Sequence, residues 1–360
     1  MALKDSLDSL DMKIIRALEE HGMKTSTREL SELLGEKDRT IRYRLAKLKE
    51  KEIVCKSKVR THERKLGLAE YILVVTSSSS HESTLKKLIE EVPMIYYHAQ
   101  TYGKYEGYLM HMVYPLGNQK VVFDLASELK KRGLIEDYYL FDVVDYIGTE
   151  AKLSELESWN WDKWSKMLPK IMAKSKEIKL DLEEIQEPVS FDASDTIILG
   201  HLVENSDITL RELGRILGLS QPQVHSRIKR LEETGIIKAY KLAMKPYDFA
   251  MTISVFFKSN YAGKILLWLD KLPFSHQITM ENKASYQVAI YLPASDTNEL
   301  LKALRSLRQH TDEMFVQFIL DASSKGYLHL IHLFSEEDGT WRLPYDEFID
   351  TVDRLAKEES

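Results

Sequence analysis

The chain has 360 residues, of which 44% are hydrophobic and 29% are charged, so it carries enough apolar material for roughly two to four domains. No stretch approaches 18 uninterrupted apolar residues, and the N-terminus lacks the apolar centre of a secretion signal. We therefore expect a cytoplasmic protein that does not enter a membrane. The single cysteine, Cys55, excludes an internal disulfide and predicts no zinc site. The net charge of -6 argues only weakly against nucleic-acid binding, because the distribution of charge matters more than its sum.

The first segment, residues 1–66, has the pattern of three short helices followed by a basic β segment. Asp8 is a suitable cap for the first helix, Gly35 ends the second, and the third begins near Asp38. Because Lys37 occupies the usual capping position, we expect Asp38 to cap the third helix and to shift its start by one residue.

Positive charge is concentrated on this third helix and the β segment after it, which we expect to form a hairpin or wing. Residues 37–65 contain 12 Lys and Arg against 4 Asp and Glu, a net charge of +8. A basic helix in a helix-turn-helix is typical of proteins that bind double-stranded DNA, whose major groove admits one helix. The exposed residues near the start of the helix are predicted to read bases: Asp38, Arg39, Thr40, Arg42 and Tyr43. Basic residues further along are predicted to contact phosphates: Arg44, Lys47, Lys56, Lys58 and Arg60.

Residues 67–150 change to a β-α-β-β-α-β order. The strands are predicted near 70–76, 94–101, 107–114 and 136–145, and the helices near 81–91 and 118–132. This order predicts a ferredoxin-like module, a four-stranded antiparallel sheet with both helices on one face. Since the other face is apolar and needs a cover, we expect the modules of this chain to pack on one another or on a second chain.

A tail, residues 151–190, follows the module and contains Trp159, Trp161 and Trp164. We expect these tryptophans to fix the tail to its own module. The alternative is that they recognise a partner, such as the basal transcription machinery. The acidic stretch 181–190 is the expected flexible boundary, because Pro188 interrupts the helical pattern.

The chain then repeats itself at an offset of 183 or 184 residues. The second copy comprises a helix-turn-helix at 191–248, a ferredoxin-like module at 249–325 and a C-terminal tail at 326–360. Its predicted strands lie near 250–257, 274–281, 285–292 and 313–320, and its predicted helices near 262–270 and 296–309. The predicted fold class is α+β, with two copies of a winged helix-turn-helix followed by a ferredoxin-like βαββαβ module, which form an intramolecular pseudo-dimer.

The second helix-turn-helix is less basic than the first. Residues 220–248 contain 6 Lys and Arg against 3 Asp and Glu, a net charge of +3. The residues predicted to read bases are Gln221, Gln223, His225 and Ser226. Those predicted to contact phosphates are Arg227, Lys229, Arg230, Lys238 and Lys241. Because the two reading faces differ, we expect unlike DNA half-sites if both copies bind.

The motifs "LDSLD" (7–11), "FDASD" (191–195) and "RELGRILGLSQPQVHSRIKRLEETGIIKAY" resemble the Lrp/AsnC family of regulators, over nearly the whole chain and twice. The resemblance implies a transcription regulator whose winged helix-turn-helix binds DNA. It also implies that the ferredoxin-like module, of the RAM type, dimerises and often senses an amino acid. A fusion of two units, as in similar archaeal regulators, makes the chain its own dimer, and a further homodimer stays open.

In that family, a Gly-x-x-acid turn joins the second and third strands of the sensing module. Gly103, Lys104, Tyr105 and Glu106 match this turn, whereas the counterpart at 281–284 has lost both the glycine and the acid. An amino-acid effector is therefore compatible only with the first copy. The alternative there is a plain hairpin.

The competing interpretation is an enzyme, since sirohaem decarboxylases share this two-module fold. His98 lies near the position of a histidine in that class, but no arginine accompanies it in its strand, which also fits an ordinary half-buried residue. His329 and His332 would point to opposite faces of a strand, which is unsuited to a shared metal. We therefore predict no catalytic residue, no metal and no cofactor.

Overall fold

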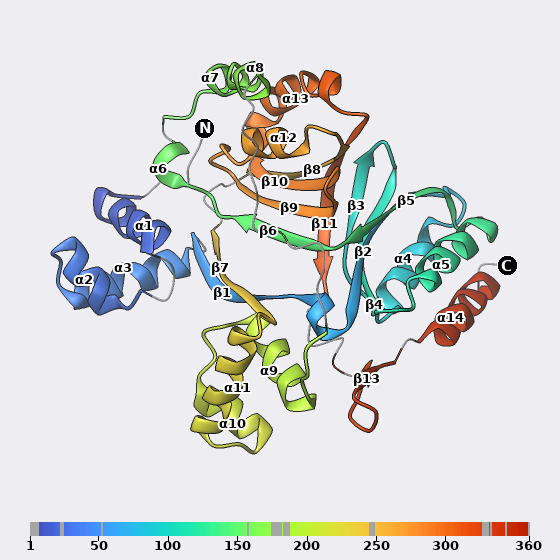
Figure 1. Cartoon of the computed structure of the whole chain (residues 1–360), viewed down its shortest axis with the longest axis horizontal. Helices are drawn as coiled ribbons and strands as arrows, with labels where there is room; N and C mark the ends of the chain where they lie inside the picture. Colours follow the sequence, from blue (N-terminus) through green and yellow to red (C-terminus); the bar gives the residue numbers. More distant parts are fainter. Residues whose placement is uncertain are drawn as a thin grey trace. The chain divides into compact units, whose positions relative to one another are not determined.

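The computed structural model describes residues 7–21, 25–51, 53–156, 158–173, 182, 188–244, 249–325, 331, 333–342 and 344–358. The chain divides into two compact units, and each unit takes segments from both repeats. Unit 1 comprises Met1–Lys58, Tyr146–Leu182 and Tyr240–Val316; unit 2 comprises Val59–Asp145, Glu183–Ala239 and Gln317–Ser360. Each unit thus combines the helix-turn-helix of one repeat with the ferredoxin-like module of the other (Figure 1). Among the described residues, no helix has the length and apolar character needed to span a membrane.

The two predicted helix-turn-helix segments are confirmed. The first consists of α1 (Ser9–His21), α2 (Thr27–Leu34) and α3 (Asp38–Glu50), and the second of α9 (Ala193–Glu204), α10 (Leu210–Leu217) and α11 (Gln221–Glu233). Gly35 and Gly218 end the middle helices with a φ of 66°, a left-handed conformation that glycine adopts without strain.

The expected cap at Asp38 is wrong. Lys37 is the N-cap of α3, without a side-chain hydrogen bond, and Asp38 is the first helical residue. Because α3 and α11 begin 183 residues apart and have equal lengths, the two helices are in register, and the expected shift by one residue does not occur.

In unit 2, the predicted first ferredoxin-like module is confirmed. Its strands are β2 (Leu68–Ser77), β3 (Ile95–Gly103), β4 (Gly107–Pro115) and β5 (Ile135–Val143), in the order β5-β2-β4-β3. Alternate residues of β2, including Tyr71, Leu73 and Val75, form a core with α4 (Glu82–Glu91) and α5 (Lys120–Lys131). The later part of β11 (Glu313–Ser324) pairs with β3, with Gln317 opposite Gly103.

In unit 1, the second module has the same strand order. β8 (Ala250–Lys258) lies between the first residues of β11 and β10 (Ser285–Pro293), and β9 (Ser275–Asn282) lies beyond β10. Its helices are α12 (Ala262–Leu269) and α13 (Thr297–Arg305), as predicted. A further strand, β6 (Asp145–Thr149), extends the sheet beyond β9. Short 3-10 helices occur at Glu63–Leu66 (η1), Ala294–Asp296 (η2) and Arg308–His310 (η3).

The winged helix-turn-helix is confirmed, but the expected hairpin within each wing is wrong. Each helix-turn-helix is followed by a single strand, β1 (Val54–Thr61) or β7 (Ile237–Met244), and these strands pair in a two-stranded sheet. In unit 2, the His62 backbone N–H also donates to the Ile236 carbonyl at 2.9 Å. The wing of each copy is therefore a single strand that pairs with the equivalent strand of the other repeat.

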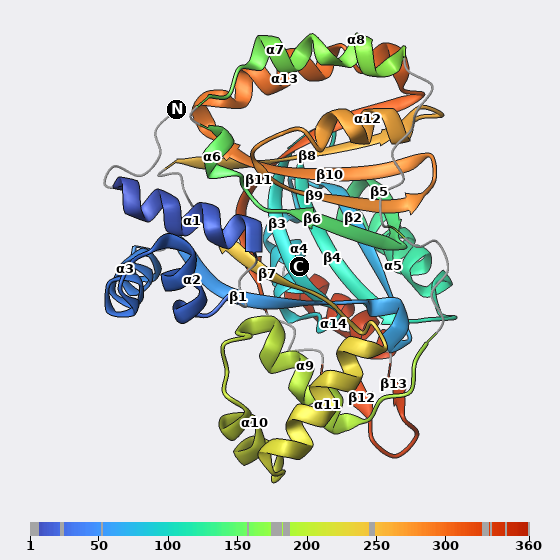
Figure 2. The same ribbon diagram turned by 60° about the vertical axis from the view of Figure 1, so that its left-hand side comes forward.

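The first tail packs on the module of the other repeat, so the expectation that it fixes to its own module is wrong. It forms α6 (Leu153–Leu156), α7 (Trp161–Ser165) and α8 (Met167–Met172). Figure 2 shows α7 beside α13, and α8 contacts α12. Trp164 stacks on Trp268 of α12 with ring centroids 3.8 Å apart, and each indole N–H donates to the other residue's carbonyl at 3.0 Å. Trp161 donates to Asp296 at 2.8 Å.

The second tail makes the reciprocal exchange within unit 2. It contains β12 (Phe334–Ser335), β13 (Thr340–Trp341) and α14 (Tyr345–Glu358). Phe348, Val352 and Leu355 of α14 join the core beneath α4. The predicted His329 and His332 lie outside the described residues. Each described tail therefore covers the helices of the other repeat's module.

Candidate nucleic-acid interface

The outer face of α3 carries the residues that we predicted to read bases. Ile41 and Leu48 are buried, which fixes which face of the helix points inward. Arg39, Arg42 and Tyr43 are exposed, with 71% of the Arg42 side chain and 64% of Tyr43 accessible. Asp38 and Thr40 are half-buried at the start of the same helix.

Within α3, Arg42 Nη2 lies 2.7 Å from Asp38 Oδ2, one helical turn away. Lys47 is exposed two turns along the helix. For Arg39 and Lys47, the described part of the chain contains no carboxylate within ion-pair distance, so their charges are available to a ligand.

Arg44 is held inside the first helix-turn-helix. Its Nη1 lies 2.5 Å from Asp8 Oδ2 and 3.3 Å from Asp11 Oδ1, so it ties α3 to the start of α1. The Asp8 carboxylate also caps α1 by accepting from the N–H groups of Leu10 and Asp11. The Asp11 N–H and the Arg44 guanidinium hold the pKa of Asp8 below its ordinary value of 3.8.

The second helix-turn-helix contains equivalent ion pairs between the third and first helices, which we call the Asp–Arg clamp, and they involve two arginines instead of one. Arg227 Nη1 lies 2.8 Å from Asp192 Oδ2 and 2.9 Å from Asp195 Oδ1, and Arg230 also pairs with Asp195. Asp195 is fully buried and completes a capping box with Asp192. Although burial raises the pKa of Asp192, Arg227 and the Asp195 N–H hold it below 3.8. The predicted cap at Asp8 is confirmed, and Asp192 is the equivalent cap in the second copy. The ion pairs of these aspartates with arginine were not predicted, although the repeated Asp-x-x-Asp motif was a signal for them.

The outer face of α11 is polar and largely uncharged. Gln221, Gln223, His225 and Ser226 are all exposed, as the prediction requires. The Gln223 Oε1 atom accepts from the Ser220 N–H at 2.9 Å and from the Ser220 hydroxyl at 2.7 Å, so it caps the helix. Lys229 lies 3.5 Å from Glu233. All three basic residues of α11 thus have carboxylate partners.

The basic residues of the paired strands have diverse surroundings. Lys58 is exposed and Arg60 is half-buried. The Lys238 ammonium pairs with buried Asp145, whose Oδ1 also lies 3.5 Å from His62 Nε2. The side chains of Lys56 and Lys241 lie outside the described residues.

Near this ion pair, unit 2 contains further acid and base groups with low exposure. The Glu70 Oε1 atom of β2 accepts from the Tyr96 hydroxyl at 2.6 Å and lies 2.8 Å from His111 Nδ1. Burial, with a further contribution from the Glu70 carboxylate, raises the pKa of Glu63 to about 8. The Thr61 hydroxyl donates to Glu63 at 2.7 Å. We therefore expect the Glu63 carboxyl to lose its proton well above the ordinary range for a glutamate.

The predicted effector turn is already filled by a side chain of the same unit. The buried amide of Gln317 accepts from the Tyr105 N–H at 3.1 Å and donates to the Tyr105 carbonyl at 2.7 Å and to Thr101 Oγ1 at 2.9 Å. Gly103 has a φ of 155°, while Lys104 and Glu106 are exposed. A ligand that used the backbone of Tyr105 would have to displace Gln317.

His98 lies on the helix-covered side of its sheet. It is 8% exposed and stands opposite Met110, a member of the core formed with α4 and α5. Burial lowers the pKa of His98, and the positive charge of Lys325 adds to this effect. The neutral, buried imidazole fits a packing role. Within the described residues, no group of three His, Cys, Asp or Glu side chains could hold a metal ion.

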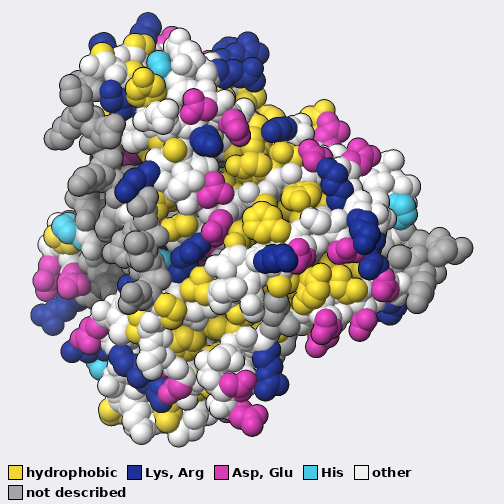
Figure 3. All heavy atoms as spheres, turned by 45° about the vertical axis from the view of Figure 1, so that its right-hand side comes forward, with side chains coloured by type: hydrophobic (Ala, Val, Ile, Leu, Met, Phe, Trp, Pro, Cys, Tyr) yellow, Lys and Arg dark blue, Asp and Glu magenta, His cyan; other side chains and the backbone are white. Residues whose placement is uncertain are grey.

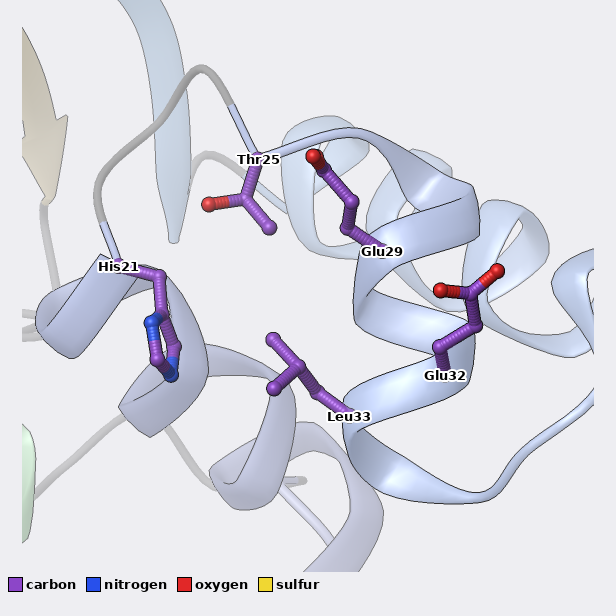
Figure 4. Close-up of a pocket in the computed structure, with 5 residues that line it drawn as sticks. All are labelled: His21, Thr25, Glu29, Glu32 and Leu33. Carbon is purple, nitrogen blue, oxygen red and sulfur yellow. The ribbon is translucent and has the colours of Figure 1, made fainter.

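A pocket of about 620 Å³ lies between α1 and α2. Figure 4 shows Leu33 of α2 pointing toward His21 at the end of α1, with Glu29 and Glu32 on the same side of α2. None of the residues that line this pocket is among those predicted to contact DNA. Figure 3 shows Lys and Arg side chains interspersed with Asp and Glu over one face of the molecule. Such a mixed face does not favour a polyanion.

Comparison with known proteins supports the geometry of both copies. Residues 7–49 match the model of the AsnC-type helix-turn-helix domain, and residues 191–238 match a winged helix-turn-helix DNA-binding model. The leucine-responsive regulatory protein of Rhizobium meliloti is 27% identical over 151 residues, which are 36% of this chain and 97% of that protein. The first copy thus contains an AsnC-type helix-turn-helix, and the chain is similar to regulators of the Lrp/AsnC type. A second similar protein, the HTH-type transcriptional regulator FL11 of Pyrococcus furiosus, is 27% identical over 113 residues, which are 30% of this chain and 74% of that protein.

A solved structure matches the fold over nearly the whole length of this chain. The siroheme decarboxylase NirDL matches with a TM-score of 0.54 over 96% of this chain and 99% of that chain, at 12% sequence identity. At this identity the match shows a common fold and carries no information about activity.

Proposed function

We propose that this protein is a transcription regulator that binds double-stranded DNA in a sequence-specific manner through at least its first helix-turn-helix. The observation that carries the proposal is the outer face of α3, where Arg39, Arg42 and Tyr43 are exposed on a helix whose buried side is fixed by Ile41 and Leu48. A helix of this size fits the major groove, and arginine is well suited to the edges of guanine.

The two copies contribute differently to this function. Arg44, Arg227 and Arg230 hold the helix-turn-helix units together, so phosphate contacts fall mainly to Lys47 and Lys58 in the first copy. The second copy offers amide, imidazole and hydroxyl groups. We propose that it reads bases at close range and adds little electrostatic affinity, so its half-site differs from the first.

Two variants test this assignment. Arg42→Ala should weaken binding and relax the choice of sequence, whereas Lys58→Ala should weaken all sequences alike. Affinities for a footprinted site and for random duplex of equal length measure both effects. Equal losses on both duplexes for both variants would contradict the assignment of Arg42 as a reading residue.

Contacts with other partners form a second part of the proposal. Because Gln317 fills the turn at Gly103–Glu106, an amino-acid effector would bind there only by displacing it. A contact with the basal transcription machinery would have to use surfaces other than Trp164, which is buried. We propose that the repeats act as an internal dimer, and sedimentation of the free protein tests for a further homodimer.

The alternative function is an enzyme of the siroheme decarboxylase type, since a protein of that class shares the fold over nearly the whole chain. The position of His98 beneath the helices argues against it, because a catalytic group must reach its substrate. Absorbance of the purified protein with added haem precursors tests this alternative. Turnover of the precursor would overturn the regulator assignment.

A further inference from the structure

An ion pair joins the first two turns of α3 on the face that we propose for DNA. Arg42 Nη2 lies 2.7 Å from Asp38 Oδ2, and most of the arginine side chain remains exposed. Asp38 is the first residue of the helix, where the helix dipole favours a carboxylate. The guanidinium carries five N–H donors in a planar fork, and this contact occupies one of its nitrogens, so other donors remain for a second ligand.

Among the described residues of the second copy, no ion pair joins the first two turns of α11. At the positions equivalent to Asp38 and Arg42, α11 carries Gln221 and His225, both exposed. The arginines of α11 are engaged by Asp192 and Asp195. The chain thus presents one reading face with an oriented cation and one with neutral groups.

Two targets in DNA compete for an exposed arginine, the phosphates and the edge of guanine. Attraction to phosphate depends on net charge, and a neighbouring carboxylate both cancels that charge and repels the phosphate. Guanine O6 and N7 are paired acceptors that match two N–H groups of an oriented fork. Adenine presents a donor in place of O6 and does not match. A carboxylate that orients arginine therefore shifts its preference from phosphate to guanine.

We infer that Asp38 positions Arg42 to select a guanine in the half-site contacted by α3, while α11 reads its half-site without a guanine requirement of this kind. This inference rests on the proposed DNA binding and specifies its recognition chemistry. Asp38 is a positioning residue, since it acts through Arg42. The natural site then has unlike halves, of which only one is sensitive to Asp38.

The test begins with selection of binding sites by the full chain from a random duplex pool. Affinities are then measured for the selected duplex and for versions in which the α3-proximal guanine is replaced by adenine or by 7-deazaguanine, which lacks the N7 acceptor. The wild type should lose roughly 10- to 100-fold on replacement by adenine. Asp38→Asn and Arg42→Lys should reduce this preference to less than about threefold. Asp38→Asn should also bind random duplex at least as tightly as wild type in dilute buffer, because a negative charge is removed.

The chain offers a matched control and a rescue variant. Glu32→Gln removes a second one-turn ion pair, in which Arg28 Nε lies 3.1 Å from Glu32 on α2, and it should leave the guanine preference unchanged. Asp38→Glu keeps the carboxylate and should retain most of the preference. Thermal unfolding of each variant shows whether the fold is intact.

The outcomes separate the inference from the function on which it rests. The inference is overturned if Asp38→Asn keeps the wild-type preference for guanine, or if it weakens selected and random duplexes equally. A loss of preference in Glu32→Gln of the same size would also overturn it. In these cases DNA binding by the chain still stands. If the wild type retains no duplex in dilute buffer, the proposed function fails together with the inference.

Discussion

Asp195→Ala should destabilise the second helix-turn-helix more than a substitution of any single exposed residue in it. The wild-type carboxylate is fully buried, pairs with Arg227 and Arg230, and accepts the N–H of Asp192 in the capping box. Removal of one member of a buried ion pair costs about 3 to 5 kcal/mol when its partner is left without water. The arginines keep 27% and 48% of their side-chain exposure, so hydration offsets part of this cost.

With about 1 kcal/mol for the lost cap, we expect a local destabilisation of about 2 to 3 kcal/mol. Hydrogen exchange measured on α9, α10 and α11 should therefore accelerate roughly 30- to 150-fold, because 1.4 kcal/mol corresponds to a factor of ten. Asp346→Ala removes an exposed aspartate from the first turn of α14 and serves as the control. Exchange that changes less than about threefold in Asp195→Ala would refute the structural role of the clamp.

Three further substitutions test other parts of the structure. Trp164→Ala should destabilise unit 1 by about 3 to 5 kcal/mol, because it removes a fully buried indole stacked on Trp268; unchanged exchange of α12 would contradict that packing. Glu63→Gln should flatten the pH dependence of the free energy of unfolding of unit 2. Because the pKa of Glu63 is near 8 in the folded protein against an ordinary 4.5, the folded state binds more protons between these values, and the stability of the wild type should fall as pH rises through this range. Denaturant titration should show a much smaller fall in the variant. Gln317→Ala should lower the free energy of unfolding by about 2 to 4 kcal/mol, because it removes the hydrogen-bond partner of the buried N–H and carbonyl of Tyr105. If added amino acids raise the melting temperature of this variant but not of the wild type, Gln317 occupies an effector site.

The elements of both repeats were predictable because their signals are local. Turn residues and the change of hydrophobic period place each strand of the modules within a few residues of its observed bounds. The Gly35 and Gly218 ends of the middle helices follow from the conformational freedom of glycine, which acts within one turn of the chain.

The exchange of tails between repeats was not predictable in the same way. Trp164 and Trp268 are more than 100 residues apart, and no local pattern states which module a tryptophan-rich helix covers. The same applies to β1 and β7, since either strand could equally have formed a hairpin within its own copy. The boundaries of the six sequence segments stay a prediction.

For the DNA-binding face, the sequence indicated which positions are exposed but not which charges are available. Helical periodicity correctly places Arg42 and Tyr43 outside and Ile41 inside. Ion pairing depends on side chains from other helices, as between Arg44 and Asp8, so a count of basic residues overestimates the charge offered to DNA.

The central claim is that the chain binds duplex DNA through a cationic helix face, and its most direct test is the affinity of the purified protein for duplex as a function of salt. Because few basic residues remain unpaired, we expect roughly 2 to 4 phosphate contacts, and affinity should fall about 10- to 150-fold between 50 and 200 mM salt. Retention of no duplex, genomic or random, even in dilute buffer would contradict the claim.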